Sequence, residues 1–101
     1  MRQISDLELI VLNKKLCSIG KTVFVKYLYP ELRRNLDISE LELSEKYPSY
    51  ANFTDNGRKT RLSSSRSIFK NGLEKEALRI IVSSQNLPSE IKDLAKSYLD
   101  E

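Results

Sequence analysis

The sequence predicts an all-α fold: a compact bundle of five to six short helices that contains a helix-turn-helix-like unit. The chain has only three glycines and three prolines in 101 residues, too few for the many turns of a β-sandwich. Two Ser-x-x-Glu capping boxes mark helix starts, and apolar residues recur three and four positions apart. A chain of this length is expected to form one domain, residues 1–101.

The first helix is predicted over about residues 6–17. Ser5 and Glu8 have the spacing of a capping box, in which each residue satisfies a backbone N–H of the first turn. Gly20 is expected to end the helix or break the turn after it. Cys17 falls on an apolar stripe, so we expect it to be an inert, buried thiol.

The second and third helices are predicted on either side of residue 35. Residues 21–34 contain β-branched side chains, but their large apolar residues follow helical spacing, so we expect a helix that is kinked or restarted at Pro30. Ser39 opens a second capping box and a short helix to about residue 46. Residues 48–55 are predicted to be a loop.

Three more helices are predicted in the second half of the chain. The first covers about residues 56–70 and is closed by Gly72 at the position after its C-cap. The next covers residues 73–84. The last begins near residue 88, where a proline suits the first helical turn, and runs to about residue 100.

The positive charge of the chain is concentrated in one segment. Residues 55–72 hold five Lys or Arg against one Asp, whereas residues 1–54 hold eight against seven and residues 73–101 hold four against six. The net charge of +3 therefore resides in this short segment. A local basic patch is the electrostatic pattern expected of an element that contacts nucleic acid.

A helical wheel at about 100° per residue divides this segment into two faces. An apolar arc holds Leu62, Ser65, Ile68 and Phe69. The opposite side holds lysine, arginine, serine and threonine, so both Arg66 and Lys70 are predicted to be exposed. Replacing each with alanine should then cost less than about 0.5 kcal/mol of stability.

These features favour a small DNA-binding protein, such as a transcriptional regulator, that reads duplex DNA with the 56–70 helix. Basic side chains neutralise phosphates, and small hydroxyls let the helix axis come close to phosphates and base edges. The candidate site residues are Arg58, Lys59, Arg61, Ser63, Arg66 and Lys70.

Within this set the expected roles differ. Lys59, Arg66 and Lys70 should contact phosphates, and Ser63 and Arg66 are the best candidates for base edges. Arg61 lies nearest the apolar arc of the wheel. An alternative role for it is to pair with an acid such as Glu45 or Glu74.

Other interpretations stay open. The basic side of the 56–70 helix could instead bind an acidic protein, as an inhibitor or adaptor would. It could also be a solvated surface without a specific role. The loop of about eight residues is longer than the 3–4 residues of a tight helix-turn-helix. A protein that binds duplex DNA often dimerises so that two half-sites are matched, which makes a homodimer possible. The 87–100 helix is long and apolar enough to form the dimer contact. A simpler role for this helix is to complete the core of its own domain.

Several classes of function find no support in the sequence. With no histidine and one cysteine, a zinc site or a nucleophile–base pair cannot be assembled, so we expect no enzyme, metal or cofactor. The GKT at residues 20–22 lacks the earlier glycine of a phosphate-binding loop. The acids around residues 37–45 are explained as helix-capping and first-turn charges. No signal peptide or membrane span is apparent, so a cytoplasmic protein is expected.

Overall fold

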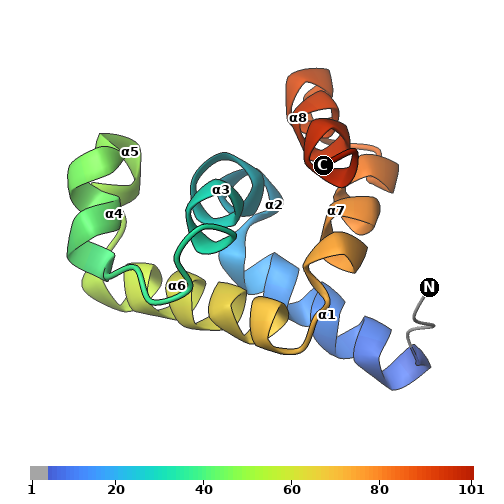
Figure 1. Cartoon of the computed structure of the whole chain (residues 1–101), viewed down its shortest axis with the longest axis horizontal. Helices are drawn as coiled ribbons and strands as arrows, with labels where there is room; N and C mark the ends of the chain where they lie inside the picture. Colours follow the sequence, from blue (N-terminus) through green and yellow to red (C-terminus); the bar gives the residue numbers. More distant parts are fainter. Residues whose placement is uncertain (1–4) are drawn as a thin grey trace.

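The part of the chain that the structure describes, residues 5–101, is folded from helices with no strand among them (Figure 1). The structure is a computed structural model. The elements are α1 (Asp6–Ile19), α2 (Lys21–Val23), η1 (Phe24–Leu28), α3 (Tyr29–Leu32), α4 (Glu40–Lys46), α5 (Pro48–Ala51), α6 (Asp55–Lys70), α7 (Glu74–Ser83) and α8 (Ser89–Leu99). Since α2, the π-helical η1 and α3 follow one another without a gap, this part of the chain has seven helical units. The predicted all-α fold is confirmed. None of these helices combines the length and the apolar character that crossing a membrane requires.

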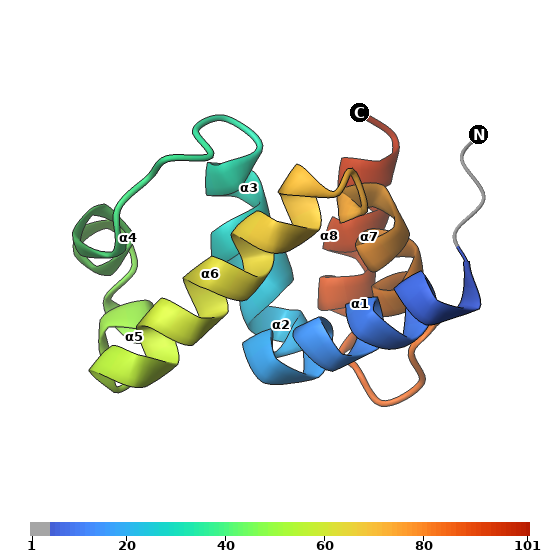
Figure 2. The same ribbon diagram turned by 90° about the horizontal axis from the view of Figure 1, so that it is seen from below.

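Helices α1 and α6 lie side by side and form one layer of the molecule, with the other helices on one side of it (Figures 1 and 2). Lys15 of α1 contacts Ser67 of α6, and Ile19 of α1 contacts Arg61, so the two helices run antiparallel. The α2–η1–α3 run crosses this layer, α7 and α8 form a hairpin at one end, and α4 and α5 lie at the other end (Figure 1). The outer sides of α1 and α6 are therefore uncovered.

The helix starts predicted at Ser5 and Ser39 and the helix end predicted at Gly20 are confirmed by cap geometry. The hydroxyls of Ser5, Ser39 and Thr54 each accept a hydrogen bond from a backbone N–H of the first turn of the helix that follows. Gly20 ends α1 with a φ of 89°, a conformation that L side chains rarely adopt. Polar caps and one glycine thus fix where these helices begin and end.

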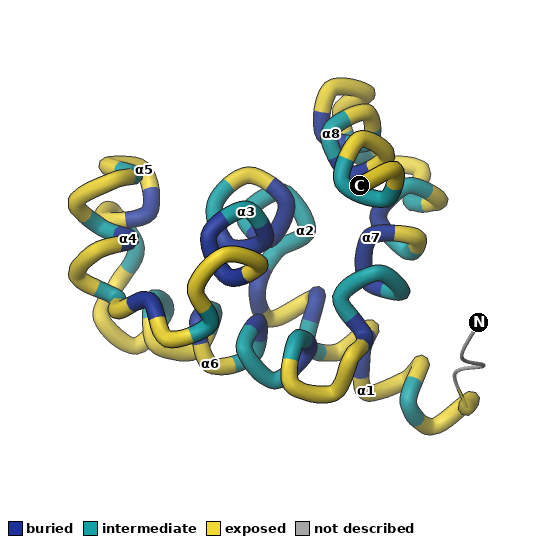
Figure 3. Tube along the Cα trace, viewed as in Figure 1, coloured by how far each residue is buried: buried dark blue, intermediate teal, exposed yellow. Residues whose placement is uncertain are grey.

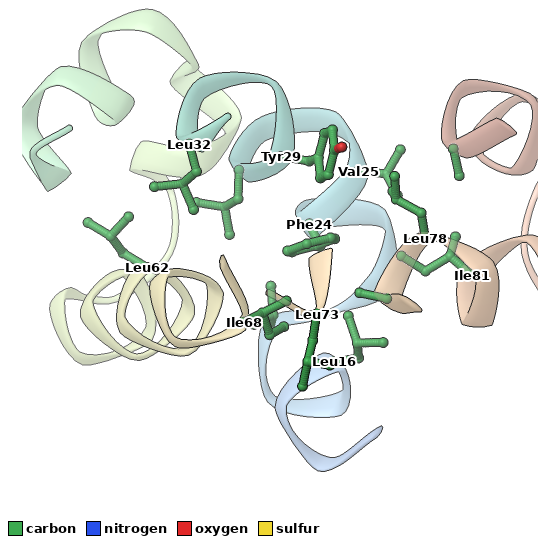
Figure 4. Close-up of a cluster of buried hydrophobic side chains, with 14 of the residues drawn as sticks. Leu16, Phe24, Val25, Tyr29, Leu32, Leu62, Ile68, Leu73, Leu78 and Ile81 are labelled. Carbon is green, nitrogen blue, oxygen red and sulfur yellow. The ribbon is translucent and has the colours of Figure 1, made fainter. Parts of the chain in front are cut away.

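A single cluster of buried apolar side chains connects the helical units. Phe24 is fully buried near its centre, with Ile68 of α6 and Leu73 beneath it (Figure 4). The cluster reaches Leu43 in α4 and Tyr50 in α5, both fully buried. Burial follows the inner sides of the helices, while their outer sides are exposed (Figure 3).

The segment predicted as a helix over residues 21–34 is helical, and a π turn precedes its proline. The N–H of Tyr29 donates to the carbonyl of Phe24, five residues earlier. Pro30 has no N–H and its ring would clash with the carbonyl four residues before it in an α-helix. The wider π turn accommodates the proline, so the helix continues to Leu32.

The prediction of a loop over residues 48–55 was wrong for its first half, which forms α5. Pro48 occupies the first turn of α5, where its missing N–H has no cost. The ring of Tyr50 is buried, and its hydroxyl donates to the carbonyl of Arg58 at 2.7 Å. The burial of Tyr50 in the core thus orders residues 48–51, although their local sequence suggests only a turn.

The prediction that Cys17 is buried was also wrong, because its side chain is exposed. Helix α1 is apolar on more than one side, so its spacing fits two different buried stripes. The structure buries the stripe that contains Leu12, Leu16 and Ile19. Cys17 lies about 100° or more from those positions on the helical wheel and faces solvent.

Candidate nucleic-acid interface

The inner face of α6 is fixed as the sequence predicts. Leu62, Ser65 and Ile68 are buried, and Thr54 caps the first turn by accepting the N–H of Gly57 at 3.0 Å. The helix carries five basic residues and one acid in 16 residues. The position of each basic side chain therefore decides whether its charge is available to a partner.

Arg58 is not directed to solvent. Its guanidinium donates to Glu40 of α4 at 2.8 Å and to the carbonyl of Ala51 at 3.0 Å, and it also contacts the carbonyl of Phe53 and the carboxylate of Asp55. The hydrogen bond to Glu40 raises the pKa of Arg58 above its ordinary value. Arg58 therefore connects α4, the α5–α6 link and α6.

Arg61 contacts α1 and an aromatic ring, not an acid. Its Nε donates to the carbonyl of Ile19 at 3.1 Å, and its guanidinium lies 4.0 Å from the centroid of the Phe53 ring. Gly57 leaves the room for it, since a Cβ there would lie 2.7 Å from Nη1 of Arg61. The alternative pairing with Glu45 or Glu74 is not what the structure has.

Arg66 holds the connection between α3 and α4. Its Nε donates to the carbonyl of Leu36 at 2.9 Å, and its Nη2 donates to the carbonyl of Ile38. The side chain is half-buried, so the prediction that Arg66 is freely exposed was wrong. A guanidinium is long and carries several donors, which lets a residue on the helix flank reach back to loop carbonyls.

The outward face of α6 holds the remaining candidates. Lys59, Thr60, Ser63 and Lys70 are exposed. Ser63, Arg66, Ser67, Lys70 and Asn71 line a polar hollow of about 470 Å³ at the C-terminal half of the helix. Of the six predicted site residues, the structure thus places Lys59, Ser63 and Lys70 on one exposed side, with Arg66 at its edge.

Two lysines of α1 extend this side and were missed by the sequence prediction. Nζ of Lys15 donates to Oγ of Ser67 at 2.7 Å, and Lys14 beside it is exposed. Residues 9–30 hold four lysines and no acid, a signal comparable to that of the α6 segment. The outward side of α6 and the adjoining part of α1 therefore form one basic surface, made of Lys14, Lys15, Lys59, Ser63, Arg66, Ser67 and Lys70, which we call the basic face.

The other motifs have structural roles. The N–H of Glu42 donates to Ser39 Oγ at 3.1 Å, as expected of a helix cap, and Glu40 in the first turn of α4 also pairs with Arg58 of α6, 18 residues further along the chain. Lys21, from the GKT segment, donates to Ser84 Oγ at 2.9 Å and connects α2 to the end of α7. Among residues 5–101, no group of three or more His, Cys, Asp or Glu side chains is placed to hold a metal ion.

No protein-family model matches the chain, and no curated protein or solved structure matches it either. The basic face is therefore the feature of the molecule from which a function is inferred.

Proposed function

We propose that this chain binds double-stranded DNA through the basic face, as a small non-enzymatic regulator of transcription would. The observation that carries the proposal is the absence of acids along α6 from Asn56 to Lys70, combined with the outward position of its lysines and hydroxyls. A duplex carries one negative charge per about 1.7 Å of axis, so such a surface gains affinity by releasing counterions.

The proposal divides the basic residues of α6 into two groups. Lys59 and Lys70 reach phosphates, and Ser63 contacts phosphates or base edges. Arg58, Arg61 and Arg66 mainly hold α6 against the loops and α1, and contribute charge to the field around the helix. Arg66, at the rim of the polar hollow, is the arginine nearest to a bound phosphate in this scheme.

The α4–α5–α6 segment supports a helix-turn-helix-like mode of binding. Helix α4 precedes α6 as the first helix of such a unit precedes the recognition helix, and α5 occupies the connection. Contacts of Arg58 and Tyr50 fix this connection to α6. Lys59 in the first half of α6 and Ser63 at its middle are both exposed, as entry of this helix into a major groove requires.

A salt titration tests the proposal. Fluorescence anisotropy of a mixed-sequence duplex should show binding tighter than about 10⁻⁴ M at low salt, weakening linearly in a plot of log affinity against log salt. The Lys59→Gln/Lys70→Gln variant should bind more weakly, with a slope reduced by about 2, since each lost phosphate contact removes roughly 0.9.

The matched control is Lys26→Gln/Lys96→Gln. These lysines are also exposed, and they lie on η1 and α8, outside the basic face. Both double variants lose two positive charges, so any difference between them reports position and not net charge. Equal slopes for the two variants, or no duplex binding at low salt, would reject the proposal and turn attention to an acidic protein partner.

A further inference from the structure

The N-terminal half of α1 exposes a stripe of apolar side chains. Leu7 is 71% exposed, Ile10 53% and Val11 41%. They lie three and four residues apart on the side of α1 opposite its core stripe of Leu12 and Leu16. Outside this stripe, the exposed large apolar side chains in residues 5–101 are Leu9 of α1, at 37%, and Leu41 of α4, at 67%, so most of the exposed large apolar side chains in this region belong to a single helix.

An apolar groove adjoins this stripe. It has a volume of about 250 Å³ and lies between α1 and the end of α6, with Leu7, Val11, Ile68 and Leu73 among its lining residues. Contiguous exposed apolar surface that includes a groove is typical of a protein–protein contact. Its occupant is identified by the charges that flank the stripe.

Charge along α1 changes sign from one end to the other. Asp6 and Glu8 flank Leu7 in the first turn, and Lys14 and Lys15 follow two turns later. If a second copy of α1 packs antiparallel on the stripe, the acids of each helix face the lysines of the other. A parallel pair would instead place lysine against lysine and acid against acid.

We propose that α1 is a homodimer interface in which two copies of the stripe pack antiparallel about a two-fold axis near Ile10 and Val11. Leu7 then packs on the aliphatic stem of the partner's Lys14, and Asp6 meets the ammonium group of the partner's Lys14. A two-fold contact uses the same patch on both copies, which requires such a self-complementary pattern.

The size of the contact predicts a weak dimer. Helix α1 has 14 residues, so it is about 21 Å long, and one helix pair buries an area at the lower end of the range for specific interfaces. We therefore expect a dissociation constant between about 1 µM and 1 mM.

The contact leaves much of the basic face free. Because α1 and α6 run antiparallel, the start of α1 lies beside the end of α6, as the groove between Leu7 and Ile68 indicates. Lys59 and Ser63 lie toward the opposite end of α6. Lys14 belongs to both surfaces, but the dimer is tested without nucleic acid, so its failure and the failure of nucleic-acid binding are distinguishable.

Sedimentation equilibrium between about 10 µM and 1 mM protein measures the association. The wild-type chain should show a monomer–dimer equilibrium, and Ile10→Lys should weaken it by at least about tenfold, because it places two charges at the two-fold axis. The control is Leu41→Lys, which places the same charge on an apolar residue of α4 that is 67% exposed and should leave association unchanged. A wild-type monomer at all concentrations, or equal effects of the two variants, would overturn the proposal.

Charge reversal tests the antiparallel orientation. Asp6→Lys and Lys14→Glu should each weaken self-association, since each opposes like charges twice in the homodimer. An equimolar mixture of the two variants should restore association, because each new charge then faces an opposite one. Absence of this mutual rescue contradicts the antiparallel pairing.

Disulfide trapping gives a second measure of orientation. In a Cys17→Ser background, Ile10→Cys should form a disulfide-linked dimer on mild oxidation, because the two residues meet at the axis. In the wild-type chain the two Cys17 side chains would lie about 20 Å apart along the paired helices, so no such link should form. A Cys17 link in the wild-type chain would show a parallel pair, and the absence of an Ile10→Cys link would remove Ile10 from the contact; either result would overturn the proposal.

Discussion

At the scale of single residues, Glu31 is the clearest buried charge. Its side chain is only 10% exposed, and its carboxylate accepts hydrogen bonds from Tyr47 Oη at 2.7 Å and from Lys46 Nζ at 3.0 Å. Burial alone would raise the pKa of Glu31, but the hydrogen bonds from Tyr47 and Lys46 outweigh it and the pKa is lowered. Burial and the bond to Glu31 also raise the pKa of Tyr47. The three side chains connect α3 to the end of α4.

A lowered carboxyl pKa predicts how stability depends on pH. The charged form of Glu31 stabilises the fold above its ordinary pKa of 4.5, and this contribution is lost as the pH falls through the lower folded-state pKa. Glu31→Gln should therefore reduce the free energy of unfolding at pH 7 by about 1–3 kcal/mol. The difference from wild type should shrink as the solution is acidified below about pH 4.

Urea unfolding at pH 7 and at pH 3.5 measures both effects. Glu45→Gln is the control, since Glu45 is an exposed acid of α4 and its change should stay within about 0.5 kcal/mol at either pH. A Glu31→Gln variant as stable as wild type at pH 7 would show that the Tyr47–Glu31–Lys46 cluster contributes nothing.

At the scale of elements, α6 shows how far the sequence predicts the candidate site. The wheel correctly separates Leu62, Ser65 and Ile68 from Lys59 and Ser63, because burial of a helix face depends on periodicity. The helical wheel could not predict that the side chains of Arg58, Arg61 and Arg66 donate hydrogen bonds to carbonyls and acids of other segments. Those contacts depend on where the loops and α1 lie, which no local pattern encodes.

Helices α1 and α5 also show that local sequence predicts helix ends better than it predicts tertiary contacts. The cap residues Ser5 and Gly20 fix the ends of α1, and they were predicted from sequence because capping is local. The buried side of α1 was not, because its apolar residues surround the helix and allow more than one orientation. Helix α5 depends on the burial of Tyr50, a tertiary interaction, and so appears in the sequence only as a turn.

The hydrogen bonds of Arg66 predict that replacing it lowers the stability of the fold more than its predicted exposure on the helical wheel suggests. Arg66→Ala removes two donors from the carbonyls of Leu36 and Ile38, and should cost about 1–3 kcal/mol in the free energy of unfolding. Arg66→Lys should recover only part of this, because one ammonium cannot reproduce the guanidinium geometry.

Thermal and urea unfolding compare these variants with Lys70→Ala. Lys70 is exposed on the same helix, and its replacement should change stability by less than about 0.5 kcal/mol. If Arg66→Ala is as mild as Lys70→Ala, the contact between α6 and the α3–α4 connection does not stabilise the fold.

At the scale of the whole molecule, α6 joins the two ends of the structure. Its 16 residues extend about 24 Å, a large part of the 35 Å longest dimension. The α4–α5 pair lies near its start and the α7–α8 hairpin near its end (Figure 1). The same helix thus supplies the core along its inner side and the basic face along its outer side.

This arrangement predicts that residues 5–101, the part of the chain that the structure describes, unfold as one cooperative domain. Leu43 of α4 and Leu78 of α7 belong to the same buried cluster, although they lie in different parts of the fold. Leu43→Ala and Leu78→Ala should each cost about 2–5 kcal/mol and lower the urea midpoint without changing the slope of the transition. Far-UV circular dichroism and tyrosine fluorescence should report coincident transitions in both variants, as expected of two-state unfolding. If Leu43→Ala caused only part of the helical circular dichroism signal to be lost in a first transition, α4 and α5 would unfold as a separate unit. The start of α6 would then not be held rigidly by α4 and α5 for contact with a duplex.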